Sequence, residues 1–245
     1  VWLRLPRPIP HGFFDFLTRA FPGKTIVNHP TGIALTSNKR FLLEFPEWCP
    51  EMQLITRVQD VLSISPSDSF VLKPLENYGG KGIIRLQKGW VSMGSRQVLL
   101  KNYLPKLEEE LSKGGYLAMR YLKNVKRGDK RVVVINGQII GAALRIPPKG
   151  SWLANAAQGG SAHLAEADER EQAMAAALSA RLLPLGIAFF GMDTLVDDQN
   201  QRVLSEINTL SIGGIQQMAD LSGKPLVEKA IEELMKYVGK RTHTH

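Results

Sequence analysis

Short segments with the hydrophobic period of β-strands alternate with helical patterns, and this alternation constrains the fold more than any other feature of the chain. The clearest segment is a hairpin predicted at residues 131–145, because two apolar strands flank Asn136-Gly137, a dipeptide that favours a type I′ turn. A second hairpin is predicted from strands at residues 187–196 and 202–208. Strands and helices that alternate in this way predict a mixed α/β (α+β) fold.

Weaker patterns predict the other elements. Further strands are expected at residues 69–74, 83–86 and 116–122. A short aromatic helix is expected through Phe13, Phe14 and Phe16, and longer helices at residues 37–45, 106–112, 165–183 and 226–238. Ser37 or Asn38 would cap the first of these longer helices, since both side chains can accept a hydrogen bond from the first turn.

Composition limits the classes of protein to which the chain can belong. The 245 residues are 44% hydrophobic and 22% charged, which is typical of a globular protein and excludes a disordered chain. No apolar run reaches the roughly 20 residues of a membrane span, so no membrane partner is expected. The single cysteine, Cys49, excludes an intramolecular disulfide and indicates a reducing compartment. The net charge of +8 favours an anionic partner: a nucleic acid, a phosphate or a polycarboxylate.

The second hairpin carries a set of oxygen donors. Its turn spans residues 197–201, so Asp193 is expected opposite Glu206, with Asn208 two positions further along the same face. Two carboxylates that face each other repel unless a cation lies between them. Because Mg²⁺ prefers such oxygens and needs few of them from the protein, we predict a metal site here. Two solvated acids at strand ends, or a slipped register, would be the alternative.

Three glycines lie in the loop between the strands at residues 69–74 and 83–86. Gly79, Gly80 and Gly82 would let backbone N–H groups approach a phosphate, although the glycines alone are also typical of a plain β-turn. A strand follows the loop where a P-loop would have a helix, so a P-loop is excluded. Lys73, just before the loop, could reach phosphate oxygens as a point charge.

Two arginines belong to the first hairpin. Arg131 begins it and Arg145 ends it, so both side chains could converge on one anion, and arginine binds carboxylates and phosphates through two parallel hydrogen bonds. A solvated run of charges is the better explanation for the neighbouring Arg127 and Lys130. It is a weaker explanation for Arg145, which lies within the apolar run at residues 142–146.

Together these motifs resemble those of the ATP-grasp ligases, and within them bacterial glutathione synthetase. The resemblance runs from about residue 1 to residue 238. It is carried by Leu72-Lys73-Pro74-Leu75 with Gly79-Gly80, by Gly128-Asp129-Lys130-Arg131, by Arg145-Ile146-Pro147 with Gly159-Gly160, and by Glu206-Ile207-Asn208. It implies an ATP-grasp fold, in which two lobes with antiparallel sheets grip the nucleotide. The implied parts are the end of a preceding lobe at 1–36, a small lobe with a glycine lid at 37–122, a large lobe with the metal site at 123–238 and a flexible tail at 239–245.

The resemblance also implies roles for particular residues. ATP phosphates would be bound by Lys39 and Lys73, under a lid formed by Gly79, Gly80, Lys81 and Gly82. The segment between the lobes would read adenine through Met119, Arg120, Tyr121 and Leu122, with Asp129 near the ribose or the base. Catalysis on the reacting carboxylate would use Arg131, Arg145 and Lys73, and two Mg²⁺ ions would be held by Asp193, Glu206 and Asn208. Substrate contacts would come from Arg131, Arg145, Asn155, Gly159, Gly160, Ser211, Gly213 and Gly214.

The implied reaction joins γ-glutamylcysteine to glycine. ATP would phosphorylate the carboxylate of the acid to an acyl phosphate, which the amine of glycine attacks, with release of ADP and phosphate. ATP and Mg²⁺ would be the cofactors, small molecules the partners and the cytoplasm the location. No nucleic-acid partner is expected, and a homo-oligomer remains open.

The chain also departs from the family's pattern. The family has an N-terminal lobe upstream of the segment that begins at Val1. It often has arginines where this chain has Leu153 and Ser161, and it commonly has Ser-Pro after Glu-Ile-Asn. Three alternatives therefore stay open: a related ligase for a different acid, a nucleotide-binding module without ligase activity, and a nucleic-acid binder. The 7% aromatic content disfavours the last.

Overall fold

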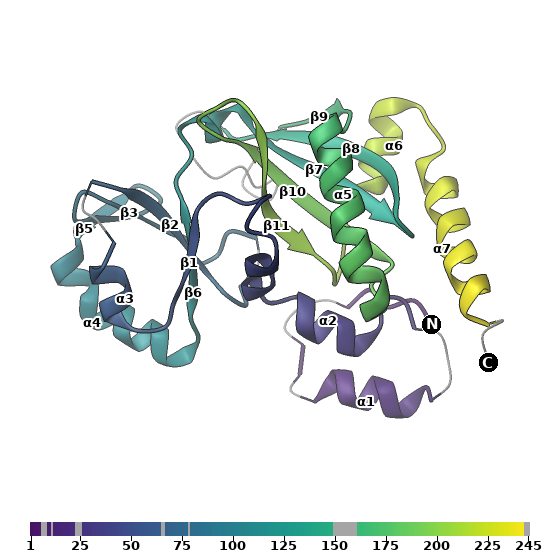
Figure 1. The fold of residues 1–245 in the computed structure, drawn as a ribbon, viewed down its shortest axis with the longest axis horizontal. Helices are drawn as coiled ribbons and strands as arrows, with labels where there is room; N and C mark the ends of the chain where they lie inside the picture. Colours follow the sequence, from purple (N-terminus) through teal and green to yellow (C-terminus); the bar gives the residue numbers. More distant parts are fainter. Residues whose placement is uncertain are drawn as a thin grey trace.

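Two antiparallel β-sheets organise the chain (Figure 1). They are seen in a computed structural model that describes residues 1–5, 9–10, 12–22, 26–64, 67–77, 79–148 and 161–242. One sheet has six strands in the order β1-β6-β2-β3-β4-β5, and the other has five in the order β11-β10-β7-β8-β9. The sheets with their covering helices confirm the predicted α+β fold with two antiparallel sheets.

The six-stranded sheet belongs to the part of the chain between residues 52 and 120. Its strands are β1 (Met52–Ile55), β2 (Ser69–Pro74), β3 (Ile84–Gln87), β4 (Trp90–Met93), β5 (Arg96–Leu99) and β6 (Tyr116–Arg120). Helices α3 (Val58–Leu62) and α4 (Leu100–Lys113) cover one face, where Val61 and Leu107 pack with Leu72. Because successive side chains of a strand point to opposite faces, Val71 and Lys73 belong to the other face.

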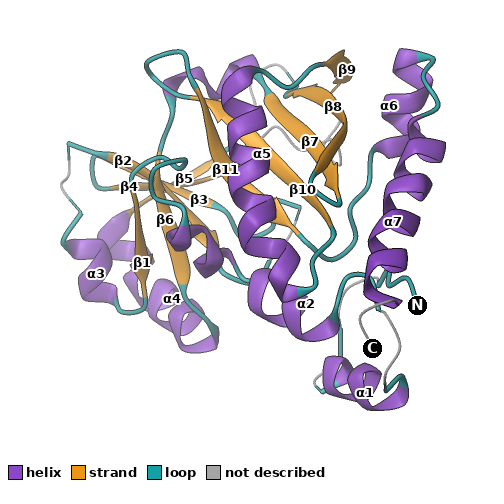
Figure 2. Ribbon diagram, turned by 45° about the vertical axis from the view of Figure 1, so that its right-hand side comes forward, coloured by secondary structure: helices purple, strands orange, loops and turns teal. Residues whose placement is uncertain are grey.

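The five-stranded sheet is covered on both faces (Figure 2). Its strands are β7 (Asp129–Ile135), β8 (Gln138–Ile146), β9 (Ser161–Ala165), β10 (Phe189–Val196) and β11 (Arg202–Asn208). Helix α5 (Glu169–Leu182), with the 3₁₀ turn η4 (Leu183–Leu185), packs on one face through Met174 and Leu178. Helices α6 (Ile215–Ser222) and α7 (Leu226–Thr242) pack on the other face through Met218 and Leu234.

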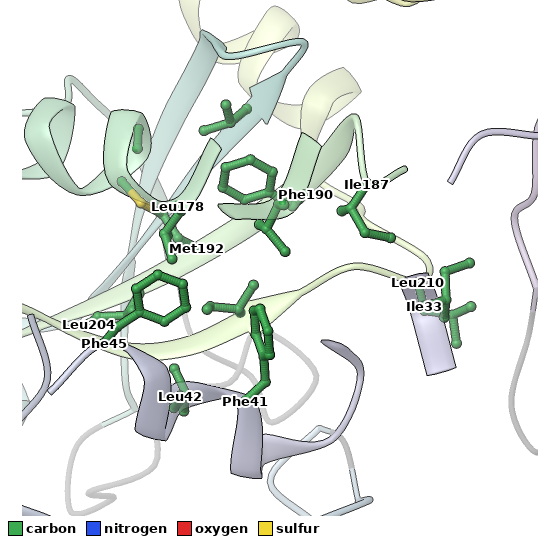
Figure 3. Packing of buried hydrophobic residues seen from close by; sticks show 14 of the residues in the cluster. Ile33, Phe41, Leu42, Phe45, Leu178, Ile187, Phe190, Met192, Leu204 and Leu210 are labelled. Carbon is green, nitrogen blue, oxygen red and sulfur yellow. The ribbon is translucent and has the colours of Figure 1, made fainter. Parts of the chain in front are cut away.

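Part of the described chain before β1 packs against the five-stranded sheet. This part of the chain contains, in order, α1 (Phe13–Ala20), α2 (Pro30–Thr36) and the 3₁₀ helix η1 (Lys39–Glu44). A second 3₁₀ helix, η2 (Lys123–Arg127), lies in the chain between β6 and β7. Figure 3 shows Phe41 and Leu42 of η1, and Phe45 directly after it, facing the buried side chains of β10, β11 and α5. This packing holds η1 and Phe45 against the five-stranded sheet.

Several predicted boundaries needed correction. Residues 37–45 were expected to form an α-helix but contain the 3₁₀ helix η1; the predicted cap is confirmed, since Asn38 Oδ1 accepts the Arg40 N–H at 2.9 Å. The helix expected from residue 165 begins at Glu169, because Asp168 caps it and residues 161–165 form the edge strand β9. The helix expected at 106–112 extends over Leu100–Lys113.

Candidate functional site

A cleft of about 880 Å³ opens between the two sheets. Residues of β2, the glycine loop and the end of β6 form one wall, and β11 with η1 contributes to the other. Ten of the residues predicted for ATP or metal line it: Lys39, Lys73, Gly80, Lys81, Met119, Arg120, Tyr121, Leu122, Asp129 and Glu206. Segments that are far apart in the sequence therefore meet in one cleft.

Two lysines cross the cleft toward β11. Lys39 Nζ lies 3.6 Å from Glu206 Oε1 and also donates to the carbonyl of Asn77. Lys73 Nζ donates to the carbonyl of Ser205 at 2.9 Å. Burial lowers the pKa of Lys73, although nearby carboxylates, Glu206 first among them, oppose this effect. Two cationic groups therefore converge beside Glu206.

The glycine loop has the backbone that only glycine adopts readily. Gly79, Gly80 and Gly82 all have positive φ angles, of 65°, 75° and 75°. A Cβ at Gly82 would also lie 3.0 Å from Pro74 Cγ. Gly80 and Lys81 line the cleft, with Gly79 and Gly82 on either side of them in the same loop. The loop joins β2 to β3, as the sequence predicted.

Behind the lysines, two arginines and two aspartates form a buried cluster. Arg131 donates from Nε and Nη2 to the two carboxylate oxygens of Asp193, the second bond being 2.7 Å long. Arg145 donates to Asp129 Oδ2 at 2.7 Å and lies 3.1 Å from Asp193 Oδ2. The two arginines do converge on one anion, as predicted. In this structure that anion is the carboxylate of Asp193.

The two aspartates of this cluster differ in how readily they ionise. Burial works against ionisation of Asp193, but Arg131 and Arg145 outweigh it and hold the pKa of this carboxyl below its usual value. Burial and the nearby Asp193 instead raise the pKa of Asp129, with Arg145 opposing. Asp193 therefore ionises more readily than Asp129, and it anchors both arginines.

The predicted oxygen donors share one face of the second hairpin. Asp193 pairs with Glu206 and Gly191 with Asn208, which confirms the predicted register, and Asn208 Nδ2 lies 3.2 Å from Asp193 Oδ2. A bulge shifts the register between Asp193 and Thr194. Among the described residues no three His, Cys, Asp or Glu side chains are grouped to hold a metal ion. Two carboxylates and an amide are the oxygen donors that Mg²⁺ takes, but here Arg131 and Arg145 hold the Asp193 carboxylate, and Glu206 is the member of the set that lines the cleft.

The remaining predicted residues lie at the margin or outside the described residues. Ser211 Oγ donates to the carbonyl of Leu5 at 2.6 Å, and Gly214 precedes α6. The segment from Ser211 to Gly214 lies near the arginines, because a Cβ on Gly191 would lie 3.2 Å from Ile212 Cγ2 and 3.1 Å from Arg131 Cδ. Asn155, Gly159 and Gly160 lie outside the described residues.

Sequence reasoning missed part of the cleft. The additional lining residues are Pro50, Val71, Pro74, Asn77, Ile83, Val125, Leu195 and Ser205. The alternation of side chains along a strand could have identified two of them, since Val71 shares a face with Lys73 and Leu195 shares a face with Asp193. The position of Ser205, which donates from Oγ to the carbonyl of Asp193 at 3.0 Å, depends on the bulge and has no sequence signal that we recognise.

Comparison of structures assigns the fold. The chain superposes on D-cycloserine synthetase with a TM-score of 0.69 at 18% identity, covering 92% of this chain and 78% of that one. It superposes on D-alanine–D-alanine ligase from Bacillus anthracis, solved with ATP, with a TM-score of 0.59 at 15% identity, covering 94% and 75%. The two sheets and the cleft between them are those of the ATP-grasp class of enzymes.

Comparison of sequences assigns the chain to one family within this class. Residues 38–223 match the family described as "Prokaryotic glutathione synthetase, ATP-grasp domain", and the chain belongs to this family of ATP-dependent ligases. It is 27% identical to glutathione synthetase of Prochlorococcus marinus subsp. pastoris, over 97% of this chain and 75% of that protein. It is 30% identical to glutathione synthetase of Rhodopseudomonas palustris, over 87% and 64%.

Proposed function

We propose that this ligase joins γ-glutamylcysteine to glycine with ATP bound in the cleft between the sheets. The observation that carries the proposal is the convergence of Lys39, Lys73 and Glu206 beside the arginines on Asp193. A nucleoside triphosphate needs cationic side chains to bind its phosphates, and the metal ion that accompanies it needs carboxylates. Side chains of both kinds line this one cleft. The relatives named as glutathione synthetases support this choice of acid and amine.

The nucleotide would lie along the six-stranded sheet. We assign its phosphates to Lys39, Lys73 and the glycine loop, and its base to the segment from Met119 to Leu122. Val71, Ile83 and Met119 line the cleft with apolar surface suited to a base. Asp129 lines the same cleft and would lie on the ribose side.

Asp193, Glu206 and Asn208 would hold Mg²⁺. Metal bound there supplies positive charge to the phosphates as their charge redistributes during transfer. Lys39 already contacts Glu206, so we expect its ammonium to move toward the phosphates as nucleotide and metal bind. The family resemblance is the basis for assigning two ions.

The acid substrate would bind at the arginine cluster. Its carboxylate oxygen attacks the γ-phosphorus of ATP and ADP leaves; the amine nitrogen of glycine then attacks the acyl carbon, phosphate leaves and the amine loses a proton. Arg131 and Arg145 neutralise the carboxylate and the transferred phosphoryl group, so catalysis consists of positioning and charge stabilisation. We assign the rest of the substrate contacts to Ser211, Gly213 and Gly214 and to Asn155, Gly159 and Gly160.

The experiment that tests this function measures ADP release. The chain is incubated with ATP, Mg²⁺, γ-glutamylcysteine and glycine, and each is omitted in turn. Glu206→Gln removes one proposed metal ligand, while Glu228→Gln on the exposed side of α7 is the matched control. We expect release that needs all four components, is lost in Glu206→Gln and is retained in Glu228→Gln.

The other outcomes are equally informative. Release that depends on a different acid or amine would keep the ligase and overturn the proposed substrates. No release from any acid, or full activity in Glu206→Gln, would overturn the assignment of the cleft.

The proposed acid substrate carries a free thiol, which suits a reducing compartment, and we propose the cytoplasm as the location. Among the described residues no helix could span a membrane.

A further inference from the structure

Arg85 occupies an unusual position beside the cleft. It lies on β3, where it pairs with Val71 of β2 on one side and Ser92 of β4 on the other. Paired residues share a face of the sheet, so Arg85 lies on the same face as Val71, which lines the cleft. A charged side chain thus stands next to the apolar surface proposed for the base.

The guanidinium of Arg85 is held over an aromatic ring. Its Cζ lies 3.6 Å from the centroid of the Tyr121 ring, well within the distance at which a cation and an aromatic face attract each other. Nε donates to Ser69 Oγ at 3.3 Å and Nη2 donates to Gln87 Oε1 at 2.6 Å. Three contacts therefore fix the guanidinium plane, and only an arginine has the planar fork that makes all of them.

Tyr121 connects this contact to the nucleotide site. It lines the cleft and follows β6 directly, and its N–H donates to the carbonyl of Ser69 at 2.7 Å. Arg85 and Tyr121 are thus joined to the same residue of β2. Arg85 also lies three residues after Gly82, the last glycine of the loop. The contact therefore links the strand that carries the glycine loop to the segment between the two sheets.

We propose that Arg85 is a positioning residue for the nucleotide, acting through Tyr121. By stacking on the ring it holds the segment from Arg120 to Leu122 in the arrangement that receives the base. The contacts described for its side chain are with Ser69, Gln87 and Tyr121 and not with the residues proposed for the phosphates or the reacting carboxylate, so its loss weakens nucleotide binding and leaves the chemical step unchanged. This inference rests on the proposed function of the cleft.

The test is a double-mutant cycle on ATP binding. The dissociation constant of ATP with Mg²⁺ is measured by calorimetry for the wild type, Arg85→Ala, Tyr121→Ala and the double variant. Arg96→Ala, on the exposed strand β5 of the same sheet, is the matched control. We expect Arg85→Ala to weaken binding about fivefold, with kcat at saturating ATP within about twofold of wild type. Arg96→Ala binds as the wild type does.

The coupling decides between positioning and general stability. We expect the double variant to bind no more weakly than Tyr121→Ala alone, because the arginine acts through the ring. Arg85→Lys keeps the charge but loses the fork, so its binding should be intermediate; it replaces Arg85→Ala if that variant does not fold. Unchanged binding, fully additive effects or a loss confined to kcat would overturn the inference. If the wild type itself binds no ATP, it is the proposed function that fails.

Discussion

Lys73 is a residue whose burial is costly for folding and to which we assign a role in function. Among the described residues its ammonium, in the cleft wall, donates to the carbonyl of Ser205 at 2.9 Å, and burial lowers its pKa although nearby carboxylates oppose this effect. A desolvated ammonium is poorly compensated by one carbonyl. Binding of an anionic phosphate would supply the missing charge, so the unfavourable burial is better explained by ligand binding than by folding.

Replacing this lysine should therefore separate activity from stability. For Lys73→Met we expect ADP release to fall by on the order of 100-fold or more, because a positioned charge is lost from the transferred phosphoryl group. The free energy of unfolding should change by less than about 1 kcal/mol, since an apolar chain of similar length replaces a buried charge. Lys101→Met, on the exposed side of α4, controls for loss of a positive charge. A large loss of stability, or retained activity, would contradict this expectation.

Cys49 should be inert despite being the single thiol of the chain. Burial raises its pKa to about 12, from a reference value of 9.0. The folded state therefore favours the protonated thiol, and this contribution to stability is present below pH 9 and is lost as the pH rises further. At pH 8 we expect iodoacetamide to label Cys49 much more slowly in the native chain than in guanidinium chloride, as followed by mass spectrometry. Rapid native labelling would contradict the burial of this side chain.

At the scale of elements, a buried network joins α5 to the back of the site strands. Lys130 on β7 was expected to be a solvated charge, and this expectation is wrong: the residue is buried, and its Nζ lies 2.6 Å from Glu171 Oε2 on α5. Thr194 on β10 donates to Glu171 Oε1 at 2.5 Å. Lys130 and Thr194 are sequence neighbours of Asp129, Arg131 and Asp193. Neighbouring residues of a strand face opposite sides of the sheet. The network therefore supports β7 and β10, the strands that carry Arg131 and Asp193, from the opposite face of the sheet.

Breaking this network should destabilise the fold. Glu171→Leu leaves the Lys130 ammonium buried without its carboxylate, and we expect a loss of about 3–5 kcal/mol in the free energy of unfolding. Glu169→Gln, an exposed change in the same helical turn, should alter it by no more than about 0.5 kcal/mol. Urea unfolding followed by circular dichroism measures both. Equal effects would show that the network adds no stability.

Replacement by alanine should change the stability of the chain in opposite directions at two glycines. Gly137 in the β7–β8 turn has φ +80°, and a Cβ there would make only ordinary contacts, 4.0 Å from Leu183 Cδ1 and from Ser179 Cβ, so Gly137→Ala should cost about 1–2 kcal/mol through backbone strain alone. Gly239 lies within α7 with no neighbouring atom near a new Cβ, so Gly239→Ala should stabilise the chain by up to about 1 kcal/mol. Thermal unfolding compares the two, and shifts of the same sign would contradict the assigned backbone.

The elements found from sequence share a property with those that were missed. Both hairpins have local pairing and strong turn chemistry, so Asn136-Gly137 and the pair Asp193–Glu206 were predictable. Strands β1, β4, β5 and β9 were not predicted. They have four or five residues each, and β9 lies at the edge of its sheet with Leu164 51% exposed, so it lacks the alternation of a half-buried strand. Their positions depend on pairing within the assembled sheet.

At the scale of the whole molecule, the site exists only when the two sheets come together. The sequence predicted most of the cleft residues, because a family resemblance supplied roles for short motifs. It did not predict that Lys73 would contact Ser205 or that Lys39 would contact Glu206. Both contacts join elements that are more than 130 residues apart in the chain, and no local pattern encodes such a distance.

The most direct test of the central claim is hydrogen–deuterium exchange with and without ATP and Mg²⁺. If nucleotide binds between the sheets, exchange should slow in peptides that cover residues 70–82, 117–122 and 203–208. The peptides of α7, which contribute nothing to the cleft lining, should exchange at the same rate in both conditions and serve as the internal control. Protection confined to other segments, or no protection at saturating ATP, would contradict nucleotide binding in this cleft and the ligase mechanism built on it.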